Sequence, residues 1–458
     1  MKNTLRILPV LAVAALIAGC EGPCQKIDTI SGPTLTAGSA DFSVIAAMGT
    51  SISAGYQSGG VVNRHQMRAF PALFAAQTGH SVLSDGTGDF SFDAINNDGI
   101  PTLLEIKSLS PLIISNAGRT SGAPLNMSQG TDYHSLAIPG QLALDVVDST
   151  YYGFGPTAVH SDVTFFNIVY RHRGLGVLQL VRRAPTFLSY EFGANEVLGT
   201  ATAGAAPSLT LLGSFTPSVL GALATIHAML PNAKVAITNV PDVTAIPFFT
   251  TFAPATIDLG TGTPVALIGP DGSLSPTDLV TLKAGDSLAI GTGFPVGSYN
   301  YLNPAAPGNG RPLADYQVLN DAERTATSNA VLAMNASLDS IVANRPWTVK
   351  VDLNGLLADI AANGYKIGAT TYTADFVTGG LFSLDGVHPN DLAHALICNA
   401  MIDAVNAGWG STIPRLNAAK YATLTSSAVR PASGEDALRG MRLEGLGTGL
   451  DMLFPRRP

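Results

Sequence analysis

The sequence contains few charged residues. Asp, Glu, Lys and Arg make up 13% of its 458 residues, and the formal net charge at pH 7 is −8. A chain that is poor in cations and acidic overall is unsuited to binding a polyanion, so we expect no nucleic-acid partner. The low charged fraction, together with many Gly, Ala and Thr residues, favours one large domain with long loops over a string of small modules.

Cysteine is almost absent, and the common cofactor motifs are missing. The three cysteines are Cys20, Cys24 and Cys398. No group of Cys and His has the spacing of a zinc site, and no G-x-x-x-x-G-K-[ST] loop is present, so we expect no metal and no other cofactor. Cys24 and Cys398 could form one disulfide in an oxidising compartment, although the sequence does not show whether their Cα atoms come within reach.

The N-terminus has the layout of an export signal. Lys2 and Arg6 precede an apolar run, Ile7 to Ala18, that is too short for a stable membrane span. The run ends in Leu16-Ile17-Ala18-Gly19-Cys20, which resembles the lipobox of bacterial lipoproteins.

The lipobox resemblance implies attachment to a membrane. Residues 1–19 would be a lipoprotein signal peptide, and Cys20 would become the lipidated first residue of the mature chain. Glu21, rather than Asp, after this cysteine implies sorting to an outer membrane. Cleavage removes Lys2 and Arg6 but no acid, which changes the net charge from −8 to −10. An ordinary signal peptide and a soluble secreted protein remain the alternative.

After a flexible tether at residues 20–41, apolar runs of strand length alternate with segments of helical length. This alternation predicts an α/β fold over residues 42–410: a three-layer α/β/α sandwich with a mostly parallel central sheet. The expected strands are Val44–Met48, Ser81–Leu83, the strand end Leu136–Gly140 with a helix following through Val147, Phe187–Phe192, Lys234–Val240 and Trp347–Val351. The expected helices are Phe70–Gln77, Val177–Arg183, Ser218–Leu230, Leu313–Ala343 as one or two helices, Leu353–Ala362 and Asp391–Ala407.

Two Gly-rich segments interrupt the alternation and predict insertions, at about residues 84–129 and 247–311. The first includes a possible hairpin at Thr102–Ser115. The second is expected to be mostly β and able to act as a lid, because a Gly-Pro-Asp-Gly turn lies between alternating segments. Residues 411–458 are expected to be a loop-like tail.

Part of an EF-hand calcium pattern occurs in the first insertion. Asn96-x-Asp98-Gly99 and Glu105 have some of its spacing, but Ala94 occupies the first ligand position and Pro101 interrupts the loop. This pattern argues against a calcium site more than for one.

The stretch from Val44 to Tyr56 is the most informative for function. A buried strand runs directly into Gly49-Thr50-Ser51, and the carboxyl ends of parallel strands face the crevice where α/β proteins bind ligands. A serine there is well placed to act as a nucleophile. The alternative is an ordinary strand-to-helix turn with the serine as a cap.

Other turn positions could supply the remaining parts of an acyl-transfer site. Such a site needs a base for the nucleophile, a group that orients the base, and donors for the developing oxyanion. His388 is the candidate base, and Asp385, three residues earlier, could orient it. Asn195, in the turn Gly193-Ala194-Asn195-Glu196, is a candidate donor.

These blocks resemble the SGNH hydrolases, also called the GDSL esterase/lipase family. Four blocks occur in the family's order: Gly49 to Gly55, Pro139-Gly140, Gly193 to Glu196, and Asp385-Gly386-Val387-His388-Pro389. The resemblance implies an SGNH (flavodoxin-like) sandwich. No G-x-S-x-G elbow is present elsewhere, which disfavours an α/β-hydrolase proper.

The resemblance also implies a role for each residue. Ser51 would be the nucleophile, His388 the base and then the acid, and Asp385 the orienting carboxylate. The N–H groups of Ser51 and Gly140 and the side-chain amide of Asn195 would form the oxyanion hole. Two positions depart from the pattern, since Thr50 and Glu196 stand where the family usually or often has Asp. The histidines without a motif are expected to be structural or surface residues: His134, His160, His172, His227 and His394.

We therefore expect a lipid-anchored envelope serine esterase or lipase. Its substrate would be an ester, either lipid-like or an acylated glycan, and the apolar, small-residue composition of Pro247–Arg311 leans towards the lipid-like one. A carbohydrate O-deacetylase with the same triad is the alternative enzyme. A non-catalytic lipoprotein that binds a partner at the cell surface is the alternative outside enzymes.

Overall fold

The computed structural model describes residues 35–153, 164–425, 438–446 and 453–454. Five predictions fall wholly or mostly outside these residues: the signal peptide, the lipid anchor on Cys20, the tether at residues 20–41, the pairing of Cys24, and His160.

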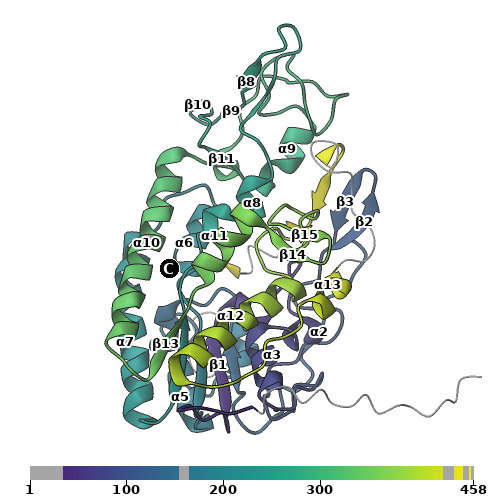
Figure 1. The fold of residues 1–458 in the computed structure, drawn as a ribbon. Helices are drawn as coiled ribbons and strands as arrows, with labels where there is room; N and C mark the ends of the chain where they lie inside the picture. Colours follow the sequence, from purple (N-terminus) through teal and green to yellow (C-terminus); the bar gives the residue numbers. More distant parts are fainter. Residues whose placement is uncertain (1–34, 154–163, 426–437, 447–452, 455–458) are drawn as a thin grey trace, which may run out of the picture.

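A five-stranded parallel sheet forms the centre of the molecule (Figure 1). Its strands lie in the spatial order β4, β1, β5, β6, β13, which is 2-1-3-4-5 in chain order, the order of flavodoxin-like folds. The direction of winding changes between β1 and β5, so the crevice at their carboxyl ends is the expected ligand site. The strands are β1 (Ile45–Gly49), β4 (Ser135–Ala137), β5 (Phe187–Tyr190), β6 (Lys234–Thr238) and β13 (Thr348–Val351).

Helices cover both faces of this sheet, as predicted for a three-layer sandwich. Alternate residues of β1 explain the two layers, because Ile45 and Ala47 pack with α3 and α12, whereas Ala46 and Met48 face the other core. The first layer holds α3 (Phe70–Gln77) and α12 (Asp391–Trp409). The second holds α5 (Gly176–Arg183), α6 (Asn195–Ala201), α7 (Leu209–Met229) and α10 (Asp321–Ala343).

Several short elements connect the layers. The helices are α1 (Ser51–Ala54), α2 (Asn63–Gln66), α4 (Thr164–Val169), α8 (Pro247–Thr250), α9 (Gly285–Ala289) and α11 (Leu353–Asn363). The 3-10 helices are η1 (Ala143–Val146), η2 (Val243–Ala245), η3 (Leu282–Ala284) and η4 (Asp315–Gln317).

Helix α7 is the one helix in the described part of the chain whose length and hydropathy would allow it to cross a bilayer. Its face formed by Phe215, Val219 and Leu223 is buried in the main core. Burial of this kind is ordinary for a core helix.

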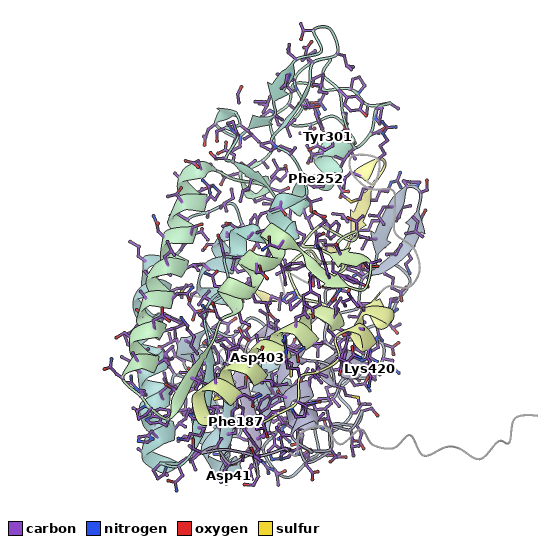
Figure 2. All side chains as sticks on the ribbon, viewed as in Figure 1. Asp41, Phe187, Phe252, Tyr301, Asp403 and Lys420 are labelled. Carbon is purple, nitrogen blue, oxygen red and sulfur yellow. The ribbon has the colours of Figure 1, made fainter. Side chains whose placement is uncertain are left out.

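The strands of the two insertions lie above the central sheet in the view of Figure 1. The first contributes the antiparallel pair β2 (Glu105–Leu109) and β3 (Leu112–Ser115), and the second contributes β7 (Ala255–Ile257), β8 (Pro264–Ala266), β9 (Ile268–Gly269), β10 (Gly272–Ser273) and β11 (Leu279–Val280). Strand β11 pairs with β12 (Val318–Leu319), and a separate hairpin joins β14 (Tyr365–Ile367) to β15 (Thr370–Tyr372). Phe252 and Tyr301 mark the second insertion in Figure 2, at the opposite end from Phe187 of β5.

Four expectations about single elements are wrong. The helix expected from Leu313 begins at Asp321, since residues 315–319 form η4 and β12 and Asn320 caps the helix. Ser81–Leu83 is not a strand, and the helix expected from Ser218 begins at Leu209, because Ser208 caps it and Pro217 is accommodated inside it. The segment 411–458 is not simply loop-like, since it contains α13 (Ala419–Thr425) and β16 (Arg442–Glu444). Strand β16 pairs in parallel with β3 and so extends the sheet of the first insertion.

Candidate active site

The candidate nucleophile lies at the start of a short helix that follows the central strand β1. All five residues of β1 are buried, and the chain turns at Thr50 into α1, whose first residue is Ser51. Gly55 ends α1 in the left-handed region, with φ of 73°. The Ser51 side chain is therefore delivered at the carboxyl edge of the sheet by a rigid strand.

The three side chains predicted to form a triad lie in one hydrogen-bonded row. The Oγ of Ser51 is 2.9 Å from Nε2 of His388, and Nδ1 of His388 is 2.9 Å from Oδ2 of Asp385. All three residues are buried. Because an ionised carboxylate only accepts hydrogen bonds, Nδ1 carries the proton, which leaves the Nε2 lone pair facing the Ser51 hydroxyl.

Asp385 is held in its ionised form by its neighbours. Burial alone would raise the pKa of Asp385, but the nearby His388 and the backbone N–H groups of Val387 and His388 outweigh it, and the pKa lies below the usual value. The N–H of Gly59 and the hydroxyl of Ser383 also donate to this carboxylate, at 3.1 and 2.9 Å.

The loop that carries Asp385 and His388 is fixed at both ends and in the middle. Its ends pair through the N–H of Ser383, which donates to the carbonyl of His388 at 2.9 Å. In the middle, the N–H of Phe248 in α8 donates to the carbonyl of Gly386 at 2.8 Å. The second insertion thus contacts this loop directly.

The first residue of α12, Asp391, anchors this helix. Asp391 is buried in the first turn and accepts hydrogen bonds from Gln57, His65 and Arg68, at 2.9, 2.8 and 2.8 Å. Burial would raise the pKa of Asp391, but these hydrogen bonds hold it well below its usual range. The start of α12 is thereby tied to the segment that follows α1.

The predicted oxyanion donors come from three neighbouring strand ends. Gly140 follows β4, Ser51 follows β1 and Asn195 follows β5, and these three strands are adjacent in the sheet. Among the described residues, no acceptor bonds to the N–H of Ser51 or of Gly140. The side chain of Asn195 donates to the carbonyl of Gln141 at 2.9 Å, which orients the amide and leaves its second N–H for a ligand.

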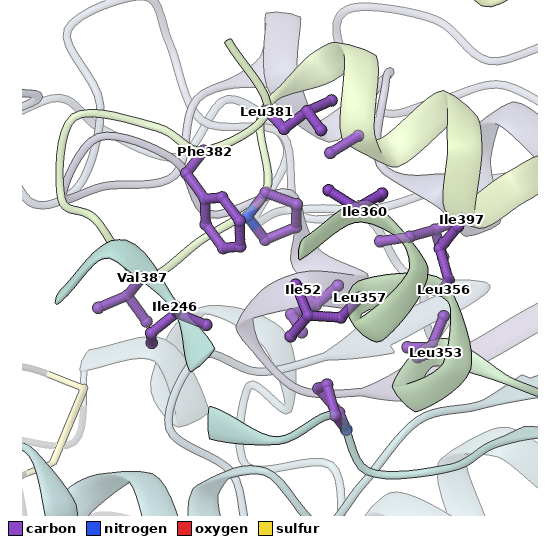
Figure 3. A pocket seen from close by; sticks show the side chains of 13 residues that line it. Ile52, Ile246, Leu353, Leu356, Leu357, Ile360, Leu381, Phe382, Val387 and Ile397 are labelled. Atoms are coloured by element: carbon purple, nitrogen blue, oxygen red, sulfur yellow. The ribbon is translucent and has the colours of Figure 1, made fainter. Parts of the chain in front are cut away.

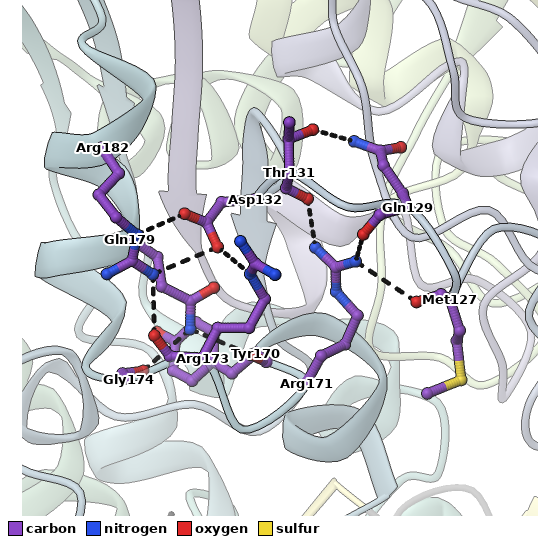
Figure 4. Close-up of polar contacts among 10 residues, drawn as sticks. All are labelled: Met127, Gln129, Thr131, Asp132, Tyr170, Arg171, Arg173, Gly174, Gln179 and Arg182. Carbon is purple, nitrogen blue, oxygen red and sulfur yellow. Dashed lines mark hydrogen bonds and ion pairs between the residues drawn. The ribbon is translucent and has the colours of Figure 1, made fainter.

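A charged cluster fixes the segment that leads into β4 (Figure 4). Asp132 accepts from Arg173 at 2.5 Å and from Arg182 at 2.7 Å. Burial raises the pKa of Asp132, whereas the bonds from the two arginines lower it, with a net decrease. Arg171 donates to the carbonyls of Gln129 and Thr131, so the chain before β4 is bound to the loop before α5.

Residues next to Ser51 and His388 in the chain line an apolar cavity (Figure 3). Ile52, which follows Ser51, lies in its wall, as do Val387 and Pro389 on either side of His388. Helix α11 supplies much of the remaining wall. All lining residues are apolar: Ile52, Pro241, Ile246, Leu353, Leu356, Leu357, Ile360, Leu381, Phe382, Val387, Pro389, Ala393 and Ile397.

One family model matches this chain, that of the GDSL-like lipase/acylhydrolases, over residues 45–401. The chain belongs to this family. A search of curated proteins found no match.

Two solved structures resemble the chain at low identity. The first, from Parabacteroides merdae, is described as a GDSL-like lipase; it is 12% identical with a TM-score of 0.32, and the alignment covers 80% of this chain and 97% of that one. The second is a carbohydrate esterase family 2 enzyme with a carbohydrate-binding domain from Corynascus thermopiles (Myceliophthora fergusii), 12% identical with a TM-score of 0.30, covering 80% and 66%.

The departure from the GDSL pattern at Thr50 coincides with a residue that the sequence analysis missed. Glu191 directly follows β5, and its buried carboxylate accepts from the N–H and the hydroxyl of Thr50 and from the hydroxyl of Ser53. Burial raises the pKa of Glu191, and these hydrogen bonds oppose that rise. The sequence predicts one continuous strand over Phe187–Phe192, whereas β5 ends at Tyr190. A charged residue inside this apolar run was the feature that could have revealed Glu191.

Glu196, the second departure, does not face the nucleophile. Its Oε1 accepts from the N–H of Ala143 at 2.8 Å. It therefore joins the start of α6, where Asn195 lies, to the segment that follows Gly140.

The tail lies outside the matched GDSL region but reaches the candidate oxyanion hole. Gly140 has φ of 79°, and a Cβ there would lie 1.9 Å from the carbonyl oxygen of Leu453. A Cβ on Gly199 would lie 3.0 Å from the ring of Phe454. Leu453 is buried in the main core, so this part of the tail packs against the site.

Among the described residues, the remaining histidines do not join the site. His134 is buried, Nδ1 contacts the N–H and hydroxyl of Ser91, and His227 stacks on Trp347. His394 is buried in α12, and neither ring nitrogen has a partner among the described residues. His172 adopts a positive φ of 55° in the loop before α5.

No metal site emerges from the described residues. They contain no group of three or more His, Cys, Asp or Glu side chains that could hold an ion. In the partial EF-hand segment, Oδ1 of Asn96 instead accepts from the N–H groups of Asp98 and Ala123. Cys398 is buried and forms no disulfide within the part of the chain that the structure describes.

Proposed function

We propose that this protein is a serine esterase that hydrolyses carboxylic esters through an acyl-enzyme. The observation that carries the proposal is the buried row Ser51–His388–Asp385, with both hydrogen bonds at 2.9 Å. A binding protein that had lost catalysis would have no need to keep a buried histidine between a serine and a carboxylate.

In the proposed reaction, Ser51 Oγ attacks the ester carbonyl while Nε2 of His388 takes its proton. Asp385 stabilises the imidazolium that forms. The same nitrogen then protonates the leaving alcohol, which releases it and leaves an ester on Ser51. Water, deprotonated by His388, attacks this ester; the bond between the acyl carbon and Ser51 Oγ breaks, His388 returns the proton to Oγ, and the free acid leaves.

The negative charge of the tetrahedral intermediate would be bound by three donors. These are the N–H groups of Ser51 and Gly140 and the amide of Asn195. Their positions are set before substrate arrives, since each follows a buried strand, so little reorganisation is needed during the reaction.

The apolar cavity supports an ester with an apolar acyl chain as substrate. Ile52, directly after Ser51, and Val387 and Pro389, on either side of His388, belong to the cavity wall. An acyl chain placed there would leave water and gain roughly 0.8 kcal/mol for each buried CH₂. An acetylated glycan offers a single methyl group and gains little from this cavity.

The first test is labelling with a fluorophosphonate probe, which reacts with activated serines. We expect wild-type protein to be labelled and Ser51→Ala to be unlabelled, with a loss of esterase activity on the order of 10⁴-fold or more. A Ser51→Ala protein that kept full activity on active esters would overturn the assignment.

The second test separates acyl esters from acetylated glycans. We expect kcat/KM for p-nitrophenyl esters to rise from acetate to longer chains, and Leu357→Trp, which narrows the cavity, to lower it at least about tenfold for long chains only. Leu332→Trp, at an exposed position of α10, serves as the control. A preference for acetylated glycans over every longer ester would favour the O-deacetylase.

We also propose that the enzyme is anchored in the cell envelope through Cys20, on the outer membrane where the cell has one. The support is the lipobox resemblance alone. Metabolic labelling with a palmitate analogue tests it, since Cys20→Ser should abolish incorporation and release the protein from the membrane fraction.

A further inference from the structure

Glu191 contacts the turn of the nucleophile on both sides of Ser51. Its Oε2 accepts from the N–H of Thr50 at 2.9 Å, from the Thr50 hydroxyl at 2.9 Å and from the Ser53 hydroxyl at 3.0 Å. The N–H of Ser53 lies 3.4 Å from the same oxygen. One carboxylate oxygen thus binds residues immediately before and two positions after the nucleophile.

The sheet brings this carboxylate to the turn. The N–H of Glu191 donates to the carbonyl of Met48 at 3.0 Å, which continues the pairing of β5 with β1 one step beyond the strand. Glu191, Thr50 and Ser53 are each at most 3% exposed. In such a dry setting a carboxylate with several donors holds them firmly.

This contact leaves no room for a side chain at residue 49, which is glycine. A Cβ at Gly49 would lie 2.3 Å from the Ser53 hydroxyl and 2.9 Å from Oε2 of Glu191. Thr50, which stands at the N-cap of α1, makes no side-chain cap bond. Its hydroxyl donates to Glu191 instead. The carboxylate that follows β5 therefore holds the start of α1 in place of a cap bond.

We infer that Glu191 is a positioning residue for the proposed esterase reaction: its carboxylate fixes the Thr50–Ser53 turn, so that Ser51 Oγ faces His388 and the Ser51 N–H faces the oxyanion. It replaces the carboxylate that the GDSL pattern has at residue 50. The inference rests on the proposed function, because a turn without a nucleophile would need no such alignment.

The test compares Glu191→Gln with wild type in fluorophosphonate labelling rate, in kcat and KM for a p-nitrophenyl ester, and in Tm. The amide keeps the shape and can keep an oxygen at the Oε2 position, but it loses the negative charge, so the bonds from Thr50 and Ser53 are no longer charge-assisted. We expect labelling rate and kcat to fall by roughly 10- to 100-fold, as for a small misplacement of a reacting group, with KM changed less than about threefold. Glu323→Gln, which removes a carboxylate from the N-terminal capping box of α10, is the control and should lower Tm alone.

A rescue variant separates positioning from mere stability. In Thr50→Asp/Glu191→Gln, the new Asp stands at the N-cap and can accept from the N–H of Ser53, as N-cap carboxylates do. We expect it to recover at least about tenfold in labelling rate over Glu191→Gln. Three results would each overturn the inference. The labelling rate of Glu191→Gln could equal that of wild type, the variant could differ from wild type in Tm only, or Thr50→Asp could fail to restore the lost labelling rate. Failure of wild type to be labelled would instead refute the proposed function.

Discussion

At the scale of the residue, Asn195 shows how one side chain can be assigned between two roles. It is the first residue of α6 and could have served only to cap that helix. Its amide instead bonds the carbonyl of Gln141 in the turn that carries Gly140. The bond joins two of the candidate oxyanion donors and directs the amide toward the site.

Asn195→Ala should therefore lower kcat by roughly 10²- to 10³-fold, as the loss of an oxyanion donor does in known serine hydrolases, while the protein stays folded. Steady-state kinetics with a far-UV CD melt checks this. Asn399→Ala is a matched control, because Asn399 is also buried and bonds to the backbone of Leu416, far from the reaction. Equal kcat values in the two variants would contradict the assigned role.

At the scale of the element, α12 combines an anchored start with a buried imidazole. Asp391 ties its first turn to the segment after α1, and His394, one turn later, is fully buried. Burial lowers the pKa of His394 to about 3. In the unfolded chain the ordinary value is about 6.5.

The lowered pKa of His394 makes the folded protein less stable as the pH falls. Below pH 6.5 the unfolded state binds a proton at His394 and the folded state does not, so this group costs about 1.4 kcal/mol of stability for each pH unit down to about pH 3. His134, whose pKa is lowered to about 4, acts in the same direction, and Asp93, whose pKa is raised to about 7, acts in the opposite one.

His394→Leu isolates one of these groups. The other titrating groups are common to both proteins, so the free energy of unfolding of the variant minus that of wild type should rise by on the order of 2 kcal/mol between pH 6.5 and 4.5. Urea unfolding at both pH values measures this. Parallel stability profiles would show that His394 is protonated in the folded protein as readily as in the unfolded chain.

At the scale of the whole molecule, the tail joins parts that are distant in sequence. Strand β16 extends the hairpin of the first insertion, Leu443 lies near Gly285 of the second, and Leu453 reaches Gly140. Among the described residues from 438 onward, the buried apolar side chains are Met441, Leu443, Leu446 and Leu453. The segment thus contributes to the main core although the family match ends at residue 401.

Deletion of residues 438–458 should therefore destabilise the enzyme. Each buried side chain is worth roughly 1.5–3 kcal/mol, partly offset by the entropy of ordering the segment, so we expect a loss of at least about 2 kcal/mol and a lower kcat. Thermal melts and ester hydrolysis check both. Deletion of residues 455–458 alone is the control, and equal stability of the two truncations would show that the tail adds nothing to the core.

Much of the sheet could be predicted from the sequence. Strands such as Ile45–Gly49 are short, apolar and buried on both faces, so their composition alone distinguishes them. Ser81–Leu83 has similar residues but no partner strand, and for this reason it stays irregular. Whether such a segment becomes a strand depends on a partner strand, and the sequence of the segment alone does not show whether one is present.

The sequence by itself determined which residues could carry the chemistry, because the blocks that contain Ser51, Gly140, Asn195 and the Asp385/His388 pair follow one another in the order of the GDSL family. Only the tertiary structure decided what surrounds them. Glu191 meets Thr50, and Leu453 meets Gly140, across long separations in the chain. Such contacts depend on strand order and on the path of the tail, and no local spacing encodes either.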